Sequence, residues 1–260
     1  MSLALPQAKK SLGQHFLVDG HYIGRIVAAI RPAAGERMVE IGPGPGALTR
    51  PLLGVLGRLD VVEVDRDMVA RLSAEFPPER LVIHQADALR FPFADLGPDL
   101  RVVGNLPYNI SSPLLFHLAD SAASIRDMCF MLQKEVVDRM AAEPATPDYG
   151  RLSVMLQARF RVEKLFVVPP GAFRPPPKVD SAIVRLTPLP AEGVPYRDGA
   201  VFADVVARAF GQRRKTLRNT LKGRVDDALF AELGIDPGRR GETLSVAEFA
   251  ALANRLVGGG

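Results

Sequence analysis

The sequence has a single cysteine, Cys129, and no long run of apolar residues. One cysteine excludes an internal disulfide and argues against a metal site built on thiolates, so we expect no metal. No apolar stretch reaches the roughly 18 residues that a membrane-spanning helix needs, so we expect no membrane partner. The lysine pair at residues 9–10 is not followed by the apolar segment of a secretory signal. These absences favour a cytoplasmic protein.

The sequence also lacks the Gly-x-x-x-x-Gly-Lys motif that grips the phosphates of nucleoside triphosphates. It has a different glycine-rich segment, residues 42–46, directly after the apolar run 38–41. Glycines there allow a tight turn from a strand into a helix and let a ligand approach the backbone. Gly42, Gly44 and Ala47 also fit a dinucleotide fingerprint. The loop alone therefore does not separate a nicotinamide cofactor from another nucleoside.

The chain has 260 residues, of which 47% are apolar, and it can bury a sizeable core. Short strand-like runs alternate with helical segments, which predicts an α/β fold with a mostly parallel sheet and helices on both faces. We expect seven strands, at residues 38–41, 60–64, 81–84, 101–103, 128–132, 165–168 and 182–186.

Residues 1–20 are expected to be an irregular basic lead-in, followed by a helix over residues 21–30. The proline-rich run 188–195 resembles a linker, and the pattern beyond it is purely helical. We therefore predict a boundary near residue 190, with one domain over residues 1–190 and a small helical domain over residues 191–260.

Polar residues follow four consecutive predicted strands, and such strand ends line one crevice of a parallel sheet. Glu63 lies 21 residues after Gly42, close to the ~20 expected of an acid that binds ribose hydroxyls. Asp87 follows the third strand and either accepts from an adenine amino group or caps a helix; both interpretations stay open. Without a phosphate-gripping lysine, S-adenosylmethionine fits this crevice: ribose on Glu63, adenine near Asp87, and the methionine portion over the glycine loop.

The fourth strand runs into Asn105-Leu106-Pro107-Tyr108. The Asn105 amide oxygen can accept one N–H bond of an adenine amino group. The Leu106 carbonyl, exposed because the chain turns at Pro107, can accept the other. Tyr108 offers a face on which the base can stack. The alternative is a polar turn in which Tyr108 serves only for packing.

Six short motifs occur in a fixed order along the chain. They are residues 14–17 (QHFL), 39–44 (VEIGPG), 63–67 (EVDRD), 105–111 (NLPYNIS), 173–181 (FRPPPKVDS) and 210–218 (FGQRRKTLR). With these motifs the chain resembles the ribosomal RNA small-subunit adenine dimethyltransferase family from about residue 9 to near its end. The resemblance implies a Rossmann-like class I methyltransferase domain with a helical C-terminal domain. It also implies dimethylation of two adjacent adenines near the 3′ end of 16S rRNA.

The resemblance also implies site residues. Its cofactor-binding positions fall on His15, Leu17, Gly42, Glu63, Asp87 and Asn105, and the family often has Asn where this chain has His15. It makes Phe173 the second face that grips the target base, whereas the sequence alone favours a core residue at the end of a strand. Lys178 can meet a phosphate, and Arg213, Arg214, Lys215 and Arg218 are expected along a helix edge that faces RNA.

The basic residues are unevenly placed. The segment 208–224 holds seven of them and no acid, which indicates a polyanion partner. The alternative is a solvated helix face. We expect the partner to be small-subunit rRNA in the assembling ribosomal subunit, and we expect a monomer.

Three other functions fit the sequence less well. Resistance methyltransferases that act on large-subunit rRNA usually have Ile where Leu106 stands and lack the continuation at residues 109–111. A non-catalytic assembly or transcription factor would not need an intact Asn105 together with an intact cofactor loop. An NAD-dependent oxidoreductase shares the glycine loop but gives no reason for Asn-Leu-Pro-Tyr.

Overall fold

The computed structural model describes residues 6–9, 12–107, 110–212 and 214–257. The chain divides into two compact units. The first unit comprises residues 1–137 and 163–188, and the second comprises residues 138–162 and 189–260.

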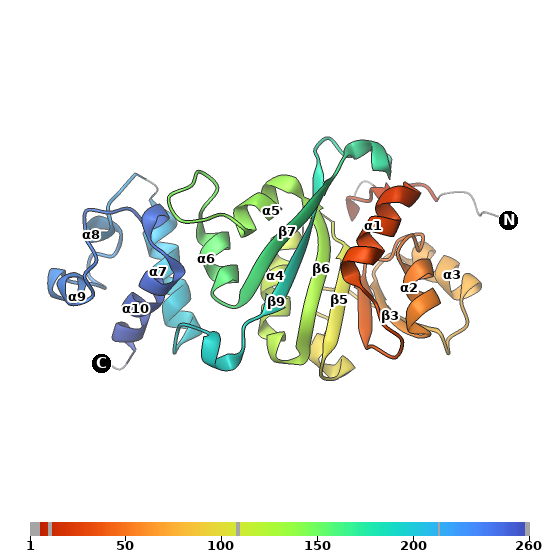
Figure 1. Cartoon of the computed structure of the whole chain (residues 1–260), viewed down its shortest axis with the longest axis horizontal. Coiled ribbons are helices and arrows are strands. Elements are labelled where there is room, and N and C mark those ends of the chain that lie inside the picture. The colour runs from red at the N-terminus through yellow and green to blue at the C-terminus, as the bar shows by residue number, and fades with distance from the viewer. Residues whose placement is uncertain (1–5, 10–11, 108–109, 213, 258–260) are drawn as a thin grey trace. The chain divides into compact units, whose positions relative to one another are not determined.

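A seven-stranded sheet forms the centre of the first unit, with the order β4-β3-β2-β5-β6-β9-β7 (Figure 1). The strands are β2 (Met38–Ile41), β3 (Leu59–Glu63), β4 (Leu81–Gln85), β5 (Leu100–Asn105), β6 (Ile125–Gln133), β7 (Phe160–Val168) and β9 (Ser181–Pro188). The neighbours from β4 to β6 run parallel, whereas β9 is antiparallel to β6. All seven predicted strands are therefore present, and the expected α/β fold is confirmed.

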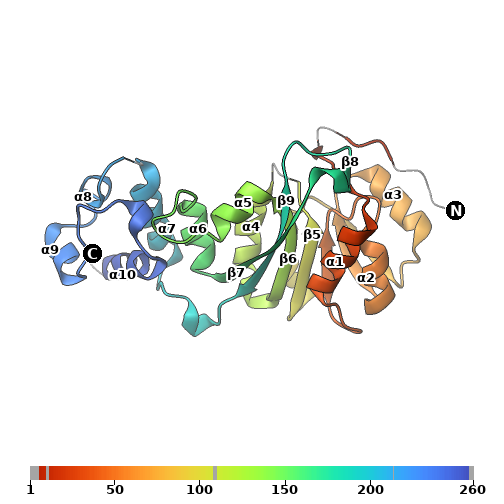
Figure 2. The ribbon, with the colours of Figure 1, turned by 45° about the horizontal axis from the view of Figure 1, so that its top comes forward.

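Helices cover both faces of this sheet, as Figure 2 shows. The helices are α1 (Gly20–Ile30), α2 (Thr49–Leu56), α3 (Arg66–Glu75), α4 (Ser111–Asp120) and α5 (Lys134–Met140). Ile30 of α1, Leu52 of α2 and Leu72 of α3 pack into one buried cluster with strand residues such as Val61 and Val103. Burial of these apolar faces holds the helices to the sheet and fixes the strand ends that carry the polar residues.

A second, two-stranded sheet involves the N-terminal segment, which the sequence predicts to be irregular. Strand β1 (Phe16–Leu17) pairs antiparallel with β8 (Phe173–Arg174). No local pattern indicates this pairing, because each strand has only two residues and its partner lies far away along the chain. The pairing ties residues 12–17 to the carboxyl edge of the large sheet.

The second unit is helical. Its helices are α6 (Arg151–Gln157), α7 (Gly199–Gly211), α8 (Leu217–Thr220), α9 (Asp227–Glu232) and α10 (Val246–Leu256). Its core contains Val154 of α6 beside Phe202 of α7 and Phe249 of α10.

The two units differ from the division at residue 190 that the sequence suggested. Residues 138–162 were assigned to the first domain, but in the structure they belong with the helical unit. The apolar side chain of Val154 needs the cluster around Phe202 to leave water, and the Tyr149 hydroxyl donates to the Leu244 carbonyl at 2.9 Å. The chain passes between the units at three points, and the linker composition marks only the last of them, at residues 188–189.

Candidate active site

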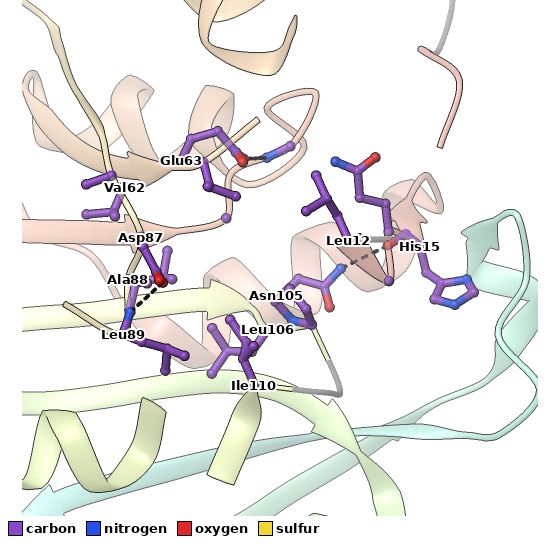
Figure 3. Close-up of a pocket in the computed structure, with 18 of the residues that line it drawn as sticks. Leu12, His15, Val62, Glu63, Asp87, Ala88, Leu89, Asn105, Leu106 and Ile110 are labelled. Atoms are coloured by element: carbon purple, nitrogen blue, oxygen red, sulfur yellow. Dashed lines mark hydrogen bonds between the residues drawn. The ribbon is translucent and has the colours of Figure 1, made fainter. Parts of the chain in front are cut away.

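A cavity of about 290 Å³ opens at the carboxyl edge of the parallel strands (Figure 3). Its walls come from the ends of β2, β3 and β5, from residues 86–89 after β4, and from residues 12–16 of the N-terminal segment. This is the crevice in which open α/β sheets bind ligands. Four of the predicted strand ends thus converge on one site.

The glycine loop after β2 forms the floor of the cavity on the side of Glu63. Gly44 has φ +52°, a left-handed conformation that glycine adopts without steric cost. A Cβ at this position would also lie 3.5 Å from the Phe16 ring. The Gly44 N–H donates to Glu63 Oε2 at 3.3 Å, so the loop is held to the end of β3.

Glu63 ends β3 and is only 6% exposed. Its Oε1 accepts from the Asp65 N–H at 2.9 Å. Burial raises the pKa of the Glu63 carboxyl, although the backbone N–H groups of Asp65 and Gly44 act in the opposite direction. The cavity is thus lined by a buried carboxyl whose oxygens already accept from backbone N–H groups and have lone pairs left for further donors.

A second buried carboxyl lies beneath the loop. Glu40 of β2 is 2% exposed and accepts from the Thr49 hydroxyl at 2.6 Å. Burial raises its pKa to about 7, and the nearby charge of Glu63 adds to the effect. Thr49 starts α2, so this hydrogen bond fixes the direction in which the helix leaves the loop.

Asp87 lines the cavity after β4, and its Oδ1 accepts from the Leu89 N–H at 2.9 Å. The helix cap that the sequence left open is wrong, because residues 88–90 form a turn and no helix starts there; the carboxylate holds this turn instead. This bond occupies one carboxylate oxygen and leaves the second lone-pair-bearing oxygen for other donors. Adenine binding by Asp87 stays a prediction.

Asn105 is the last residue of β5, and its side chain reaches the cavity. The Nδ2 group donates to the His15 carbonyl at 3.1 Å, as the dashed line in Figure 3 shows. Because an amide is planar, this bond turns Oδ1 away from His15. Leu106 and Pro107 also line the cavity, whereas Tyr108 lies outside the described residues.

Gly104 holds β5 close to β2, a role that the sequence alone did not indicate. A Cβ on Gly104 would lie 2.4 Å from the Ile41 carbonyl oxygen, which belongs to the neighbouring backbone. No side chain fits there unless the two strands separate.

We therefore expect Gly104→Ala to lower the free energy of unfolding by about 1–3 kcal/mol, because the methyl group overpacks against backbone. The variant should also displace Asn105 and lower activity. Gly24→Ala is the matched control: this helical glycine has no neighbour within 4 Å, so its free energy of unfolding should stay equal or rise. Urea denaturation of both variants measures the difference, and equal midpoints would contradict the close-approach explanation.

Two residues implied by the resemblance are placed differently from expectation. Leu17 is 4% exposed and Phe173 is 1% exposed; both belong to the apolar core of the first unit and do not line the cavity. They face each other across the β1–β8 pair, where burial stabilises both side chains. Phe173 thus has the packing role that its sequence context also allowed, and its base-gripping role stays a prediction.

His15 contributes to the cavity through its backbone. Its carbonyl accepts from Asn105, whereas its imidazole extends to the other side, with Nδ1 2.9 Å from the Pro175 carbonyl (Figure 3). The family often has Asn where this chain has His15. Either residue can serve, because the group that accepts from Asn105 is the backbone carbonyl, which every residue has.

The predicted RNA-binding residues of the basic segment do not lie along one helix edge: Arg214 and Lys215 are in an exposed turn, whereas Arg218 is in α8. Helix α7 ends at Gly211, Arg214 and Lys215 lie in the turn before α8, and Arg213 lies outside the described residues. The reason is that Leu217 must be buried, which requires the chain to bend. Lys178 is exposed in the first unit.

Acids from outside the basic segment neutralise part of it. Asp204 pairs with Arg208 and Arg224, and Asp227 pairs with Arg218 at 3.1 Å. The charge that the sequence concentrates in this segment is therefore partly cancelled by helix neighbours. Among the described residues, no carboxylate forms an ion pair with Arg214 or Lys215, which leaves both cations for an external anion.

Neither a metal-binding cluster nor a membrane-spanning helix occurs among the residues that the structure describes. These residues contain no group of three or more His, Cys, Asp or Glu side chains placed to hold a metal ion. They also contain no helix that is both long and apolar enough to cross a membrane.

The family model described as "Ribosomal RNA adenine dimethylase" matches residues 6–257. A ribosomal RNA small subunit methyltransferase A from Aromatoleum aromaticum is 64% identical, with 96% of this chain and 95% of the relative covered. The protein of the same name from Thiobacillus denitrificans is 62% identical, covering 96% of this chain and 98% of the relative.

Two solved structures are similar over almost the whole chain. A dimethyladenosine transferase from Plasmodium falciparum has a TM-score of 0.80 at 25% identity, covering 92% of this chain and 96% of that one. The 23S rRNA methyltransferase ErmE has a TM-score of 0.69 at 26% identity, covering 93% and 99%. The fold is therefore that of the class I, Rossmann-like methyltransferases.

Proposed function

The chain belongs to the ribosomal RNA adenine dimethylase family, and on this premise we propose its reaction and the residues that perform it. It transfers methyl groups from S-adenosylmethionine to the N6 atoms of two adjacent adenines near the 3′ end of 16S rRNA. The substrate is the assembling small ribosomal subunit, on which the protein acts as a cytoplasmic monomer. The observation that carries the proposal is the meeting of a nucleoside-sized cavity with the Asn105 amide at the end of β5.

The donor groups around the cavity fit S-adenosylmethionine. The buried Glu63 carboxylate accepts from the ribose hydroxyls, and Asp87 accepts from the adenine amino group. Gly42 and Gly44 leave room for the methionine portion beside the backbone. The cavity volume of about 290 Å³ is near the lower end for small-molecule sites.

Asn105 and Leu106 prepare the amino nitrogen of the target adenine for attack. This nitrogen is a weak nucleophile because its lone pair is conjugated with the ring. Asn105 Oδ1 and the Leu106 carbonyl accept its two N–H bonds, which favours a pyramidal nitrogen and stabilises the positive charge that grows on it. When bound, S-adenosylmethionine supplies an electrophilic sulfonium methyl group.

Positioning provides the catalytic gain, and the proposal needs no general base. The methylated amine is acidic enough to lose its proton to water once the transfer is complete. Leu106 and Ile110 give the cavity apolar walls beside Asn105, so a nitrogen that already carries one methyl group can still be accommodated (Figure 3). Tyr108 remains our proposal for the stacking face. The target base must leave its helical stack to reach this point.

The direct test incubates the protein with methyl-labelled S-adenosylmethionine and small subunits that lack these modifications. Digestion of the RNA should release labelled N6,N6-dimethyladenosine. Large subunits in a parallel incubation separate this activity from that of the structurally similar 23S rRNA methyltransferase. Label found only in large-subunit RNA would contradict the proposed substrate.

We further propose that Arg214, Lys215, Arg218 and Lys178 contact RNA phosphates. The exchange Arg214→Glu with Lys215→Glu should weaken binding to the small subunit and reduce the slope of log affinity against log salt by about one for each phosphate that is no longer neutralised. Arg58→Glu, another exposed charge reversal, serves as the control. Filter binding at several salt concentrations measures the slopes. Equal slopes for the double variant and the unmodified protein would show that Arg214 and Lys215 contact water and not RNA phosphates.

A further inference from the structure

The N-terminal residues 12–16 form one wall of the cofactor cavity, and we call them the strap. Besides the β1–β8 pair and the buried side chain of Phe16, polar contacts attach the strap to the rest of the first unit. Two groups of contacts matter: one at Asp65, beyond the end of β3, and one at Asn105. Both contacts join the strap to residues next to the proposed methyl-donor site.

The contact at Asp65 is a closed ring of hydrogen bonds. The Asp65 side chain is fully buried, and its Oδ1 accepts from Lys9 Nζ at 2.5 Å while Oδ2 accepts from Gln14 Nε2 at 2.9 Å. Gln14 Oε1 accepts in turn from the Lys9 N–H at 2.8 Å. Burial opposes ionisation of Asp65, but the hydrogen bonds from Lys9 and Gln14 outweigh it and lower its pKa. The carboxylate is therefore charged and saturated with donors.

Asp65 is also joined directly to the proposed ribose-binding carboxylate. Its N–H donates to Glu63 Oε1 at 2.9 Å. One residue thus contacts Glu63 through its backbone and the strap through its side chain. Gln14 itself lines the cavity, so a shift of the strap also changes the shape of the cavity that Glu63 lines.

The second contact links the strap to the reacting end of the site. The His15 carbonyl follows Gln14 directly in the chain and accepts from Asn105 Nδ2 at 3.1 Å. This bond decides which way the amide of Asn105 faces, and therefore whether Oδ1 is presented to the target nitrogen. The His15 carbonyl keeps this position as long as the neighbouring Gln14 holds the strap to Asp65.

We propose that Asp65, Gln14 and Lys9 are positioning residues, which hold the strap closed over the methyl donor and thereby keep the Asn105 amide in its productive orientation. This inference rests on the proposed function of the cavity. It assigns a catalytic consequence to residues that touch neither the target base nor the reacting methyl group.

The test measures S-adenosylmethionine binding by calorimetry and methyl transfer by labelled assay for the full chain and two variants, Gln14→Leu and Lys9→Met. Each variant removes a hydrogen bond to a charged group, so cofactor affinity should fall about tenfold. At saturating cofactor kcat should still fall severalfold, because Asn105 is no longer fixed in orientation. Lys9→Arg should restore both values. The Lys9 side chain is 41% exposed, so its replacement does not open the core.

A double-mutant cycle with Asp65→Asn tests whether the residues act as one unit. The loss in Lys9→Met with Asp65→Asn should be smaller than the product of the single losses. Asp198→Asn is the matched control, because the Asp198 side chain caps α7 within the second unit. It should leave cofactor affinity unchanged.

The outcomes separate this inference from the function on which it depends. If the unmodified protein binds no S-adenosylmethionine, the proposed function itself fails. If the unmodified protein binds it, and Gln14→Leu and Lys9→Met bind and react equally well, the strap has no positioning role. A fall in thermal stability with unchanged affinity and kcat would likewise overturn the inference, since it would show a purely structural contact.

Discussion

Asn105→Ala is expected to lower kcat for methyl transfer by about 10²–10³-fold, the range seen when one preorganised polar group is removed from a transition-state site. The reason is that Asn105 Oδ1 holds one N–H bond of the target amine and stabilises the charge that develops on nitrogen. Cofactor affinity should change much less, because Glu63 and Asp87 remain. Single-turnover rates at saturating cofactor, together with calorimetric binding, measure the two effects separately.

Asn105→Asp is the matched variant for this prediction. A carboxylate keeps an acceptor at the same position but lacks the Nδ2 donor that bonds to the His15 carbonyl. We therefore expect a rate between those of the unmodified protein and Asn105→Ala. Full activity in Asn105→Ala would remove the amide from the mechanism and leave the Leu106 carbonyl to act alone.

Glu63→Gln is expected to weaken S-adenosylmethionine binding by roughly 10–100-fold, because the buried charged acceptor for the ribose hydroxyls is removed. The change falls mainly on KM for the cofactor, and kcat at saturation should stay close to normal. Glu79→Gln, an exposed carboxylate of the same unit, is the control and should bind normally.

The pH dependence of binding gives a second readout of Glu63. Burial raises the pKa of this carboxyl, so it protonates at a higher pH than an ordinary glutamate does. The charged form accepts from the ribose, so affinity is present above the Glu63 pKa and is lost as pH falls through it. Glu63→Gln should flatten this dependence. A variant that keeps both the affinity and the pH profile of the unmodified protein would contradict the ribose-binding role.

The sequence predicted the large sheet and the polar strand ends because both rest on local patterns. Apolar runs bounded by glycine and proline located the seven strands, and a parallel sheet brings strand ends such as Glu63 and Asn105 to one edge. The resemblance to a known family then supplied the chemistry. These parts of the site could be predicted without knowing which distant residues contact each other, because the parallel sheet alone brings the strand ends together.

The parts that the sequence did not predict depend on long-range pairing. The bond between Asn105 and His15, and the bond between Asp65 and Gln14, join residues 90 and 51 positions apart. No periodicity marks such contacts; the only signal was the motif at residues 14–17. The burial of Phe173 depends in the same way on its pairing with Leu17, which lies far away along the chain.

Composition was also a poor guide to the second unit and its charge. The proline-rich linker is visible in the sequence, but the earlier segment around Val154 joins the helical core through long-range packing and hydrogen bonds such as that from Tyr149 to Leu244. The basic segment showed no internal acid, yet Asp204 from the same helix as Arg208 pairs with it. The positive charge available to RNA therefore depends on acidic residues that lie outside the basic segment in the sequence but next to it in the structure.

The central claim is that one cavity holds the methyl donor with its ribose on Glu63 and its reactive end toward Asn105. A crystal structure of the protein with S-adenosylhomocysteine, the product of methyl transfer, tests it most directly. We predict that the ribose hydroxyls lie within hydrogen-bonding distance of the Glu63 carboxylate and that the sulfur faces Asn105. A product bound elsewhere, or in the cavity with its sulfur away from Asn105, would contradict the account.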